Sequence, residues 1–228
     1  MTDREDPQSL RDRIVDTAID LAEQEGWEDL RLRKVAERCG VDLADVLSEF
    51  RDIDAVANAW FERALAAMLQ PPEQGFQGRP AGERVHSVMM RWFDATAAHR
   101  RLTGEMIRTK LYTSHPHHWV PMVFSLSRLI HWVREAAMLD AGGRQRQAEE
   151  IGLTLVFLRT LREWLRDATP GHQHTRRYLA RRLVWLDCLT REGRSIMPPA
   201  ASGQHSRPPA PRADQPVHRP GSASAERV

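Results

Sequence analysis

Hydrophobic positions recur every three or four residues along most of the chain, which is the spacing of helices that bury one face. The first predicted helix runs from a cap at Ser9 to Gly26, and a fourth begins at Ile53 and ends before Pro71 and Pro72. The same periodicity predicts further helices over residues 83–98, 101–113, 117–140, 144–168 and 172–191. The pattern therefore predicts an all-α protein.

The stretch from Leu32 to Phe50 predicts two short helices joined by a tight turn. Ala36, Gly40 and Val46 have the relative spacing of a helix-turn-helix: a small residue where the helices touch, a glycine at the turn, and an aliphatic residue that returns to the core. Because this motif places its second helix in the DNA major groove in many proteins, DNA is a candidate partner.

Proline and glycine divide the rest of the chain. Residues 71–82, PPEQGFQGRPAG, predict a connection between a small helix-turn-helix domain over residues 1–70 and a larger helical domain over residues 83–192. Residues 198–228 hold seven of the fourteen prolines and almost no large apolar residue, so we expect a disordered C-terminal tail there.

The charge of the chain is unevenly distributed. Residues 1–70 contain nine Lys and Arg against seventeen Asp and Glu, a net charge of −8, whereas the whole chain has a formal charge of +2. An acidic domain is unusual for DNA binding, which draws much of its affinity from neutralised phosphates. The basic residues closest to the motif are Arg31, Arg33, Lys34 and Arg38. They either hold a DNA backbone or form a solvated face that pairs with neighbouring carboxylates.

The second helix of the motif carries acidic residues on its outward side. Asp42, Asp45 and Glu49 are three and four residues apart and so share one helix face, while Val46 and Phe50 turn inward. Three carboxylates would repel the phosphates beside a groove. Asp42 is also a candidate cap of its helix, which would leave two carboxylates unexplained.

The C-terminal domain is rich in aromatic and methionine side chains, whose ordinary role is to form its core. If a ligand binds, these residues predict an apolar pocket for an apolar small molecule or lipid. The predicted lining residues are Met89, Trp92, Phe93, Met106, Trp119, Met122, Phe124 and Phe157. Apolar rows on helices 144–168 and 172–191 either form a homodimer interface or pack inside one subunit.

No catalytic motif is present, so we expect no enzymatic activity and no cofactor. His115, His117 and His118 flank Pro116, but no Cys, Asp or Glu lies nearby in sequence, and we predict no metal site. There is neither an apolar run of membrane-spanning length nor a signal peptide at the N-terminus, which favours a cytoplasmic protein without a transmembrane segment.

Three segments carry a family resemblance: RIVDTAIDLAEQEGW, KVAERCGV and the Phe50 that closes the motif. Over about residues 10–60 the chain resembles the TetR family of bacterial transcriptional regulators. The resemblance implies a dimeric DNA-binding protein with a helical domain that senses a small molecule. The candidate DNA-contacting residues, taken from the motif and the basic residues beside it, are Arg31, Arg33, Lys34, Arg38, Ala44, Asp45 and Ser48.

The chain departs from the family pattern at several of its functional positions. The usual small Gly-Thr pair is Ala44 and Asp45, the usual phosphate-contacting Tyr is Leu47, and the usual Lys at the start of the next helix is Ile53. The fold signature is therefore stronger than the DNA-contact signature.

A second resemblance lies in VFLRTLREWLRDATPGHQHTRRYLARRL. It is similar to the C-terminal part of the lipid-binding accessory proteins of ubiquinone biosynthesis, which share the TetR-like fold and are not known to bind DNA. Trp164, Asp167, Thr169 and Thr175 are among the residues that carry it. Two hypotheses follow: a ligand-responsive TetR-like regulator, or a lipid- or isoprenoid-binding protein that has lost DNA binding.

Overall fold

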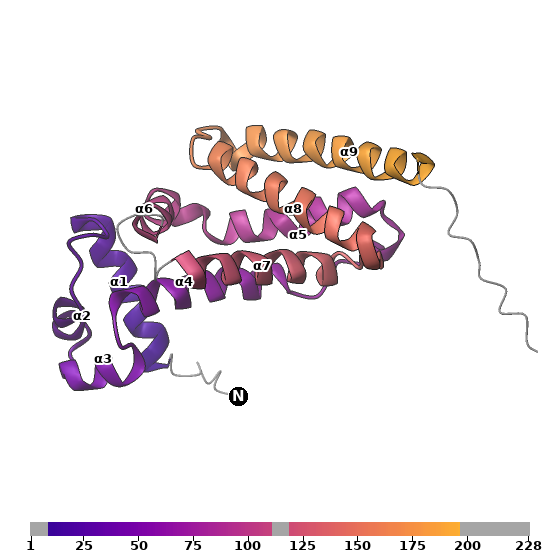
Figure 1. The fold of residues 1–228 in the computed structure, drawn as a ribbon. Helices are drawn as coiled ribbons and strands as arrows, with labels where there is room; N and C mark the ends of the chain where they lie inside the picture. Colours follow the sequence, from indigo (N-terminus) through magenta and orange to yellow (C-terminus); the bar gives the residue numbers. More distant parts are fainter. Residues whose placement is uncertain (1–8, 111–118, 197–228) are drawn as a thin grey trace, which may run out of the picture.

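The structure is a computed structural model that describes residues 9–110 and 119–196, with side chains for residues 9–110 and 126–184. Within these ranges it is helical and contains no strand (Figure 1), which confirms the predicted all-α class. The N-terminal helices are α1 (Leu10–Glu25), α2 (Leu32–Cys39), α3 (Leu43–Glu49) and α4 (Ile53–Met68). They are followed by α5 (Ala81–Ala95), α6 (Arg100–Lys110), α7 (Trp119–Ala136), α8 (Gly143–Trp164) and α9 (Gln173–Ile196). Short 3-10 helices are η1 (Phe76–Gly78), η2 (Ala97–His99) and η4 (Pro170–His172).

The helix ends follow from local chemistry. Ser9 Oγ accepts a hydrogen bond from the Asp12 amide at 3.1 Å and so caps α1. The Asp52 carboxylate does the same for α4, accepting from the Ala55 amide at 2.8 Å. Gly26 ends α1 with a φ of +93°, which a residue with a Cβ rarely adopts.

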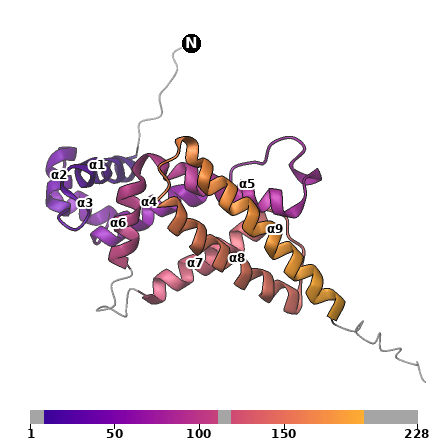
Figure 2. The same cartoon turned by 90° about the horizontal axis from the view of Figure 1, so that it is seen from above.

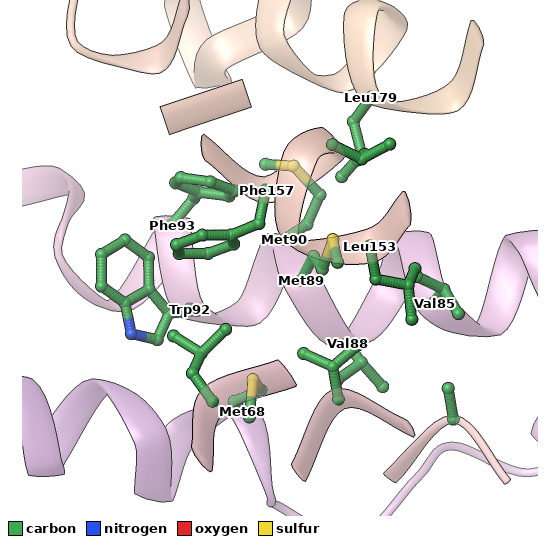
Figure 3. Close-up of a cluster of buried hydrophobic side chains, with 14 of the residues drawn as sticks. Met68, Val85, Val88, Met89, Met90, Trp92, Phe93, Leu153, Phe157 and Leu179 are labelled. Carbon is green, nitrogen blue, oxygen red and sulfur yellow. The ribbon is translucent and has the colours of Figure 1, made fainter. Parts of the chain in front are cut away.

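Buried apolar side chains form two cores. The first joins α1, α2, α3 and the first half of α4, and it also contains Leu102 and Met106 of α6. The second joins the last turns of α4 with α5, α7, α8 and α9. Figure 3 shows side chains of α5 in this second core between Leu179 of α9 on one side and Met68 of α4 on the other. Two helices, α4 and α6, therefore hold the N-terminal end against the rest.

The segment predicted as a connection is partly built into the second core. Phe76 of η1 is 2% exposed and packs with Met68 and Val85. Sequence composition marked this segment by its Pro and Gly content, whereas the single phenylalanine among them determines where it lies. The division of the chain at residues 71–82 stays a proposal.

The two views place α2 and α3 at one end of the molecule, with α9 lying across α8 on the side of α5 away from α4 (Figures 1 and 2). A buried arginine holds the turn between α7 and α8: Arg134 is ion-paired with Glu149 and donates to the Ala141 carbonyl at 2.9 Å. Among the described helices, none is long and apolar enough to cross a membrane. The predicted tail over residues 198–228 lies outside the described residues.

Candidate nucleic-acid interface

The turn of the helix-turn-helix has the predicted geometry. Gly40 ends α2 in the left-handed conformation, with φ +68° and ψ +34°, and the Val41 amide donates to the Ala36 carbonyl at 3.1 Å. Ala36, Val46 and Phe50 are all buried. The inward positions of the motif therefore lie where the sequence pattern predicts.

Two arginines of α1, which the sequence did not single out, fix the motif to the rest of its core. Arg11 donates to the Glu49 carbonyl at the end of α3 at 3.2 Å, and its guanidinium lies 4.4 Å from the centre of the Phe50 ring. Arg13 donates to the Cys39 carbonyl at the end of α2 at 3.0 Å. Both cations lie at helix C-termini, where the unpaired carbonyls carry partial negative charge. Nothing in their spacing signals this role, because their partners are 26 and 38 residues away.

The structure changes the interpretation of the acidic face of α3. The Asp42 amide donates to Asp45 Oδ2 at 3.2 Å, and the two residues form a capping box at the start of the helix. Asp42 and Asp45 thus have a structural role, and Glu49 is the carboxylate of this face that remains without one. Ser48 Oγ donates to the Asp45 carbonyl at 2.7 Å, which ties its hydroxyl to the helix backbone.

The outward side of α3 also carries an apolar strip beside its acidic residues. Leu43 and Leu47 lie four residues apart, and their exposed fractions are 42% and 47%. Ala44, between them in sequence, is exposed as well. Leu43 and Leu47 lie next to the buried Val46 and Phe50 around the helix, so the apolar surface of α3 extends beyond what its own domain covers.

The four basic residues predicted to hold DNA differ in whether they have partners within the protein. Arg31 donates to the carbonyls of Glu28 at 2.8 Å and Leu30 at 2.9 Å, and Lys34 pairs with Glu25 at 2.5 Å. Arg33 and Arg38 are exposed, and within the described part of the chain neither has an ion-pair partner. These two guanidinium groups are the ones left available to phosphates.

A further cation lies at the start of α4. The Arg51 side chain is 86% exposed, and its Nε is 2.9 Å from Asp52 Oδ2. The sequence pattern did not single it out.

Four of the predicted pocket residues come together in the second core. Trp92, Phe93 and Phe157 are in mutual ring contact, with centroids 5.2–5.5 Å apart, and Met89 is buried with them (Figure 3). Met106 lies apart from them in the first core, because α6 turns its apolar face toward α1 and α4. The side chains of Trp119, Met122 and Phe124 lie outside the described residues, as do His115, His117 and His118.

Several polar atoms in this aromatic core lack a partner. Trp92 Nε1, Trp164 Nε1 and Thr160 Oγ1 are buried, and within the described residues none makes a hydrogen bond. An indole N–H only donates, and leaving it unpaired in an apolar interior costs about 1–3 kcal/mol. These groups are chemically suited to a bound small molecule that offers hydrogen-bond acceptors.

Two open clefts at the surface are polar. One, of about 370 Å³, lies between α1, the start of α6 and the α8–α9 turn. Its charges are largely paired within the protein, since Glu23 contacts His99 at 3.1 Å and Arg101 at 3.2 Å. The other, of about 170 Å³, is lined by Arg159, Arg162, Glu163, Tyr178 and Arg182 on α8 and α9. Neither is lined by the residues predicted for an apolar pocket.

The apolar rows on α8 and α9 divide into an inner and an outer set. Leu161, Leu179 and Leu183 are buried within the subunit. The outer set has exposed fractions of 43–66% and consists of Ile151, Leu155 and Leu158 on α8 and Val184 on α9. The inner set packs inside one subunit, and the outer set is suited to an interface. Both uses predicted for these rows therefore have residues suited to them.

Comparison with solved structures gives a consistent picture. A TetR transcriptional regulator from Nitrosomonas europaea ATCC 19718 has a TM-score of 0.70 and 40% sequence identity, over 78% of this chain and 98% of that one. A TetR transcriptional regulator from Rhodococcus sp. RHA1 matches with a TM-score of 0.56 and 17% identity, over 76% and 93% of the two chains. A TetR-family regulator from Streptomyces coelicolor matches at 0.55 and 15%, over 82% and 89%. No protein-family model and no curated protein matches the chain.

Proposed function

The chain belongs to the TetR family of transcriptional regulators, and from this premise we propose that it binds DNA as a homodimer and is controlled by an apolar small molecule. The observation that supports DNA binding best is the condition of the helix-turn-helix. Its buried positions are intact, and two of the three carboxylates on the face of α3 form a capping box, so they have a structural role although their charge still faces outward. The protein would act in the cytoplasm, beside its DNA target, and catalysis is not part of the proposal.

A salt titration of DNA binding tests this function. The full chain is mixed with labelled genomic fragments, and the dissociation constant is measured from about 50 to 200 mM salt. We expect log K to fall linearly with log salt, because each phosphate contact releases condensed counterions.

Replacing Arg33 or Arg38 with Ala should reduce the slope by about two in a dimer, one contact per subunit. Arg79→Ala, which lies directly after η1 and is paired with Glu73, is the matched control. Undetectable binding at the lowest salt would rule the function out.

The aromatic core supports the second element of the proposal, a ligand. Trp92, Phe93 and Phe157 supply flat apolar surface, and the unpaired indole N–H groups of Trp92 and Trp164 favour a guest with hydrogen-bond acceptors. Entry of the guest would require these rings to move apart. Mass spectrometry of small molecules that co-purify with the protein tests this, and a guest without an acceptor would contradict it.

The exposed apolar residues of α8 and α9 support the third element, the homodimer. A twofold-symmetric contact needs a self-complementary surface, and a row of aliphatic side chains on adjacent helices satisfies that requirement. The two subunits would then each present one helix-turn-helix to DNA.

The acidic charge of residues 1–70 favours one alternative, a lipid-binding protein on the same scaffold that no longer binds DNA. The C-terminal motif gives this alternative less support than the sequence suggested. Asp167 accepts hydrogen bonds from Thr169 and Thr175 at the α8–α9 turn, and Asp167 and Thr169 line the polar cleft there, whereas the aromatic core is made by other residues. An apolar guest together with absent DNA binding would favour this alternative over the regulator.

A further inference from the structure

We infer that Leu43 and Leu47 read thymine methyl groups in the major groove, so that this protein recognises its DNA site by apolar contact at these positions. The inference rests on the proposed function, since it requires that α3 enters the groove. It concerns which feature of the bases the helix recognises. Leu47 stands where the family usually has a phosphate-contacting Tyr, but a leucine has no hydrogen-bond donor for a phosphate, so we assign it to the bases.

The distribution of exposed large apolar side chains is the first reason. In the described part of the chain they occur on α8 and α9, at Leu69, and at Leu43 and Leu47 of α3. The α8 and α9 residues are accounted for by the proposed dimer, and Leu69 is isolated at the end of α4. Leu43 and Leu47 form the remaining pair. They lie one turn apart on a helix of seven residues, so they present one continuous apolar strip.

The second reason is the identity and hydrogen bonding of the polar side chains on α3. Ser48 donates its hydroxyl hydrogen to the Asp45 carbonyl, and an Asp45 carboxylate oxygen accepts from the Asp42 amide. No Arg, Lys, Asn or Gln is present on α3, although these are the side chains that usually form paired hydrogen bonds with guanine or adenine. Ala44, beside the leucines, is small enough to let the helix approach the bases closely.

The major groove offers one apolar group that matches this surface. Thymine presents a methyl group on C5 there, and no other DNA base carries one. Removing one methyl group from a tight apolar contact weakens binding by about three- to fivefold. The inference therefore predicts a loss of affinity that can be measured for one thymine at a time.

Uracil substitution provides the test, because uracil differs from thymine only by lacking this methyl group. A library of random duplexes made with thymine is enriched on the full-length protein, and a selected site is resynthesised with uracil at each thymine in turn. We expect a three- to fivefold rise in the dissociation constant at one or more positions in each half-site, and little change at the other thymines.

Protein variants assign the effect to the two leucines. Leu43→Ala and Leu47→Ala should each weaken binding to the thymine site and abolish the uracil penalty at the base that the residue contacts, as a double-mutant cycle would show. Leu69→Ala is the matched control: Leu69 has an exposed fraction of 43%, like those of the α3 leucines, but lies at the end of α4. Leu69→Ala should leave both the affinity for the thymine site and the uracil penalty unchanged.

The possible failures can be distinguished. If the protein enriches a site and uracil is neutral at every position, the methyl-reading role is wrong while DNA binding stands. A uracil penalty that persists unchanged in both alanine variants also overturns the role of the leucines. If no sequence is enriched at low salt, the proposed DNA-binding function fails, and this inference fails with it.

Discussion

At the scale of single residues, Asp167 shows how one carboxylate orders a turn. Its two oxygens accept hydrogen bonds from the amide and hydroxyl groups of Thr169 and of Thr175, at 2.6–2.9 Å. Burial by itself would raise the pKa of Asp167, but the hydrogen bonds from the two threonines outweigh it and hold the pKa well below the ordinary value. The residue joins the end of α8 to the start of α9.

Replacing Asp167 with Asn should lower the free energy of unfolding by about 2–4 kcal/mol at pH 7, because an amide NH₂ then faces one pair of donors. Urea unfolding followed by circular dichroism measures the loss. The control is Asp20→Asn, which changes an exposed carboxylate of α1. Equal stabilities for the two variants would show that the four hydrogen bonds contribute little.

The same bonds predict a pH dependence. Since folding lowers the pKa of Asp167, its contribution is fully present above the unfolded-state pKa of about 4 and is lost as pH falls toward the folded-state value. The stability difference between the wild type and Asp167→Asn should therefore be constant from pH 5 to 7 and shrink below pH 4. Unfolding curves at pH 3 and pH 6 test this, and a difference that grows in acid would contradict it.

At the scale of elements, α3 shows what the sequence determines and what it leaves open. The spacing of Ala36, Gly40 and Val46 predicted both helices and their turn, because these features depend on neighbours in sequence. Asp42, Asp45 and Glu49 are all exposed, as predicted, but the sequence did not show that Asp45 also accepts from the Asp42 amide in a capping box. Periodicity shows that a side chain faces outward, but does not show which amide it accepts from.

The two roles of Asp45, capping and charge, can be separated by substitution. Asp45→Asn keeps an oxygen that can accept from the Asp42 amide, so it should change stability by under about 0.5 kcal/mol, whereas Asp45→Ala should cost about 1 kcal/mol. Both remove a negative charge beside the DNA and should strengthen binding at about 100 mM salt by a few-fold. Fluorescence anisotropy with a selected duplex measures this. Glu49→Gln, which leaves the capping box intact, should strengthen binding similarly.

At the scale of the whole molecule, the exposed residues of α8 and α9 make oligomeric state testable. Leu155→Glu should convert the proposed dimer to a monomer at micromolar concentration, because two buried carboxylates would face each other across the twofold axis. Light scattering coupled to size-exclusion chromatography gives the mass. Leu69→Glu, which is similar in exposure and lies at the end of α4 rather than on α8 or α9, should stay dimeric. A Leu155→Glu variant that remains a dimer would place the interface elsewhere.

Long-range packing is the part that the sequence left undetermined. Each helix was predicted within a few residues of its observed bounds, but Met106 was expected beside Trp92 and lies instead in the first core. Periodicity shows that a helix has an apolar face, but it does not show which helix packs against that face. The hydrogen bond from Trp60 Nε1 to Thr103 Oγ1, at 3.3 Å, joins residues 43 apart in sequence and illustrates the same limit.

The sharing of α4 and α6 between the two cores has a consequence for domain exchange. A fragment ending at residue 70 would lack Leu102 and Met106, so the helix-turn-helix would lose part of its own interior and should not fold alone. A chimera that transfers this helix-turn-helix to another regulator would need α6 as well. For the same reason, calorimetry of the intact chain should show one melting transition, and two resolved transitions would mean that the halves are separable modules.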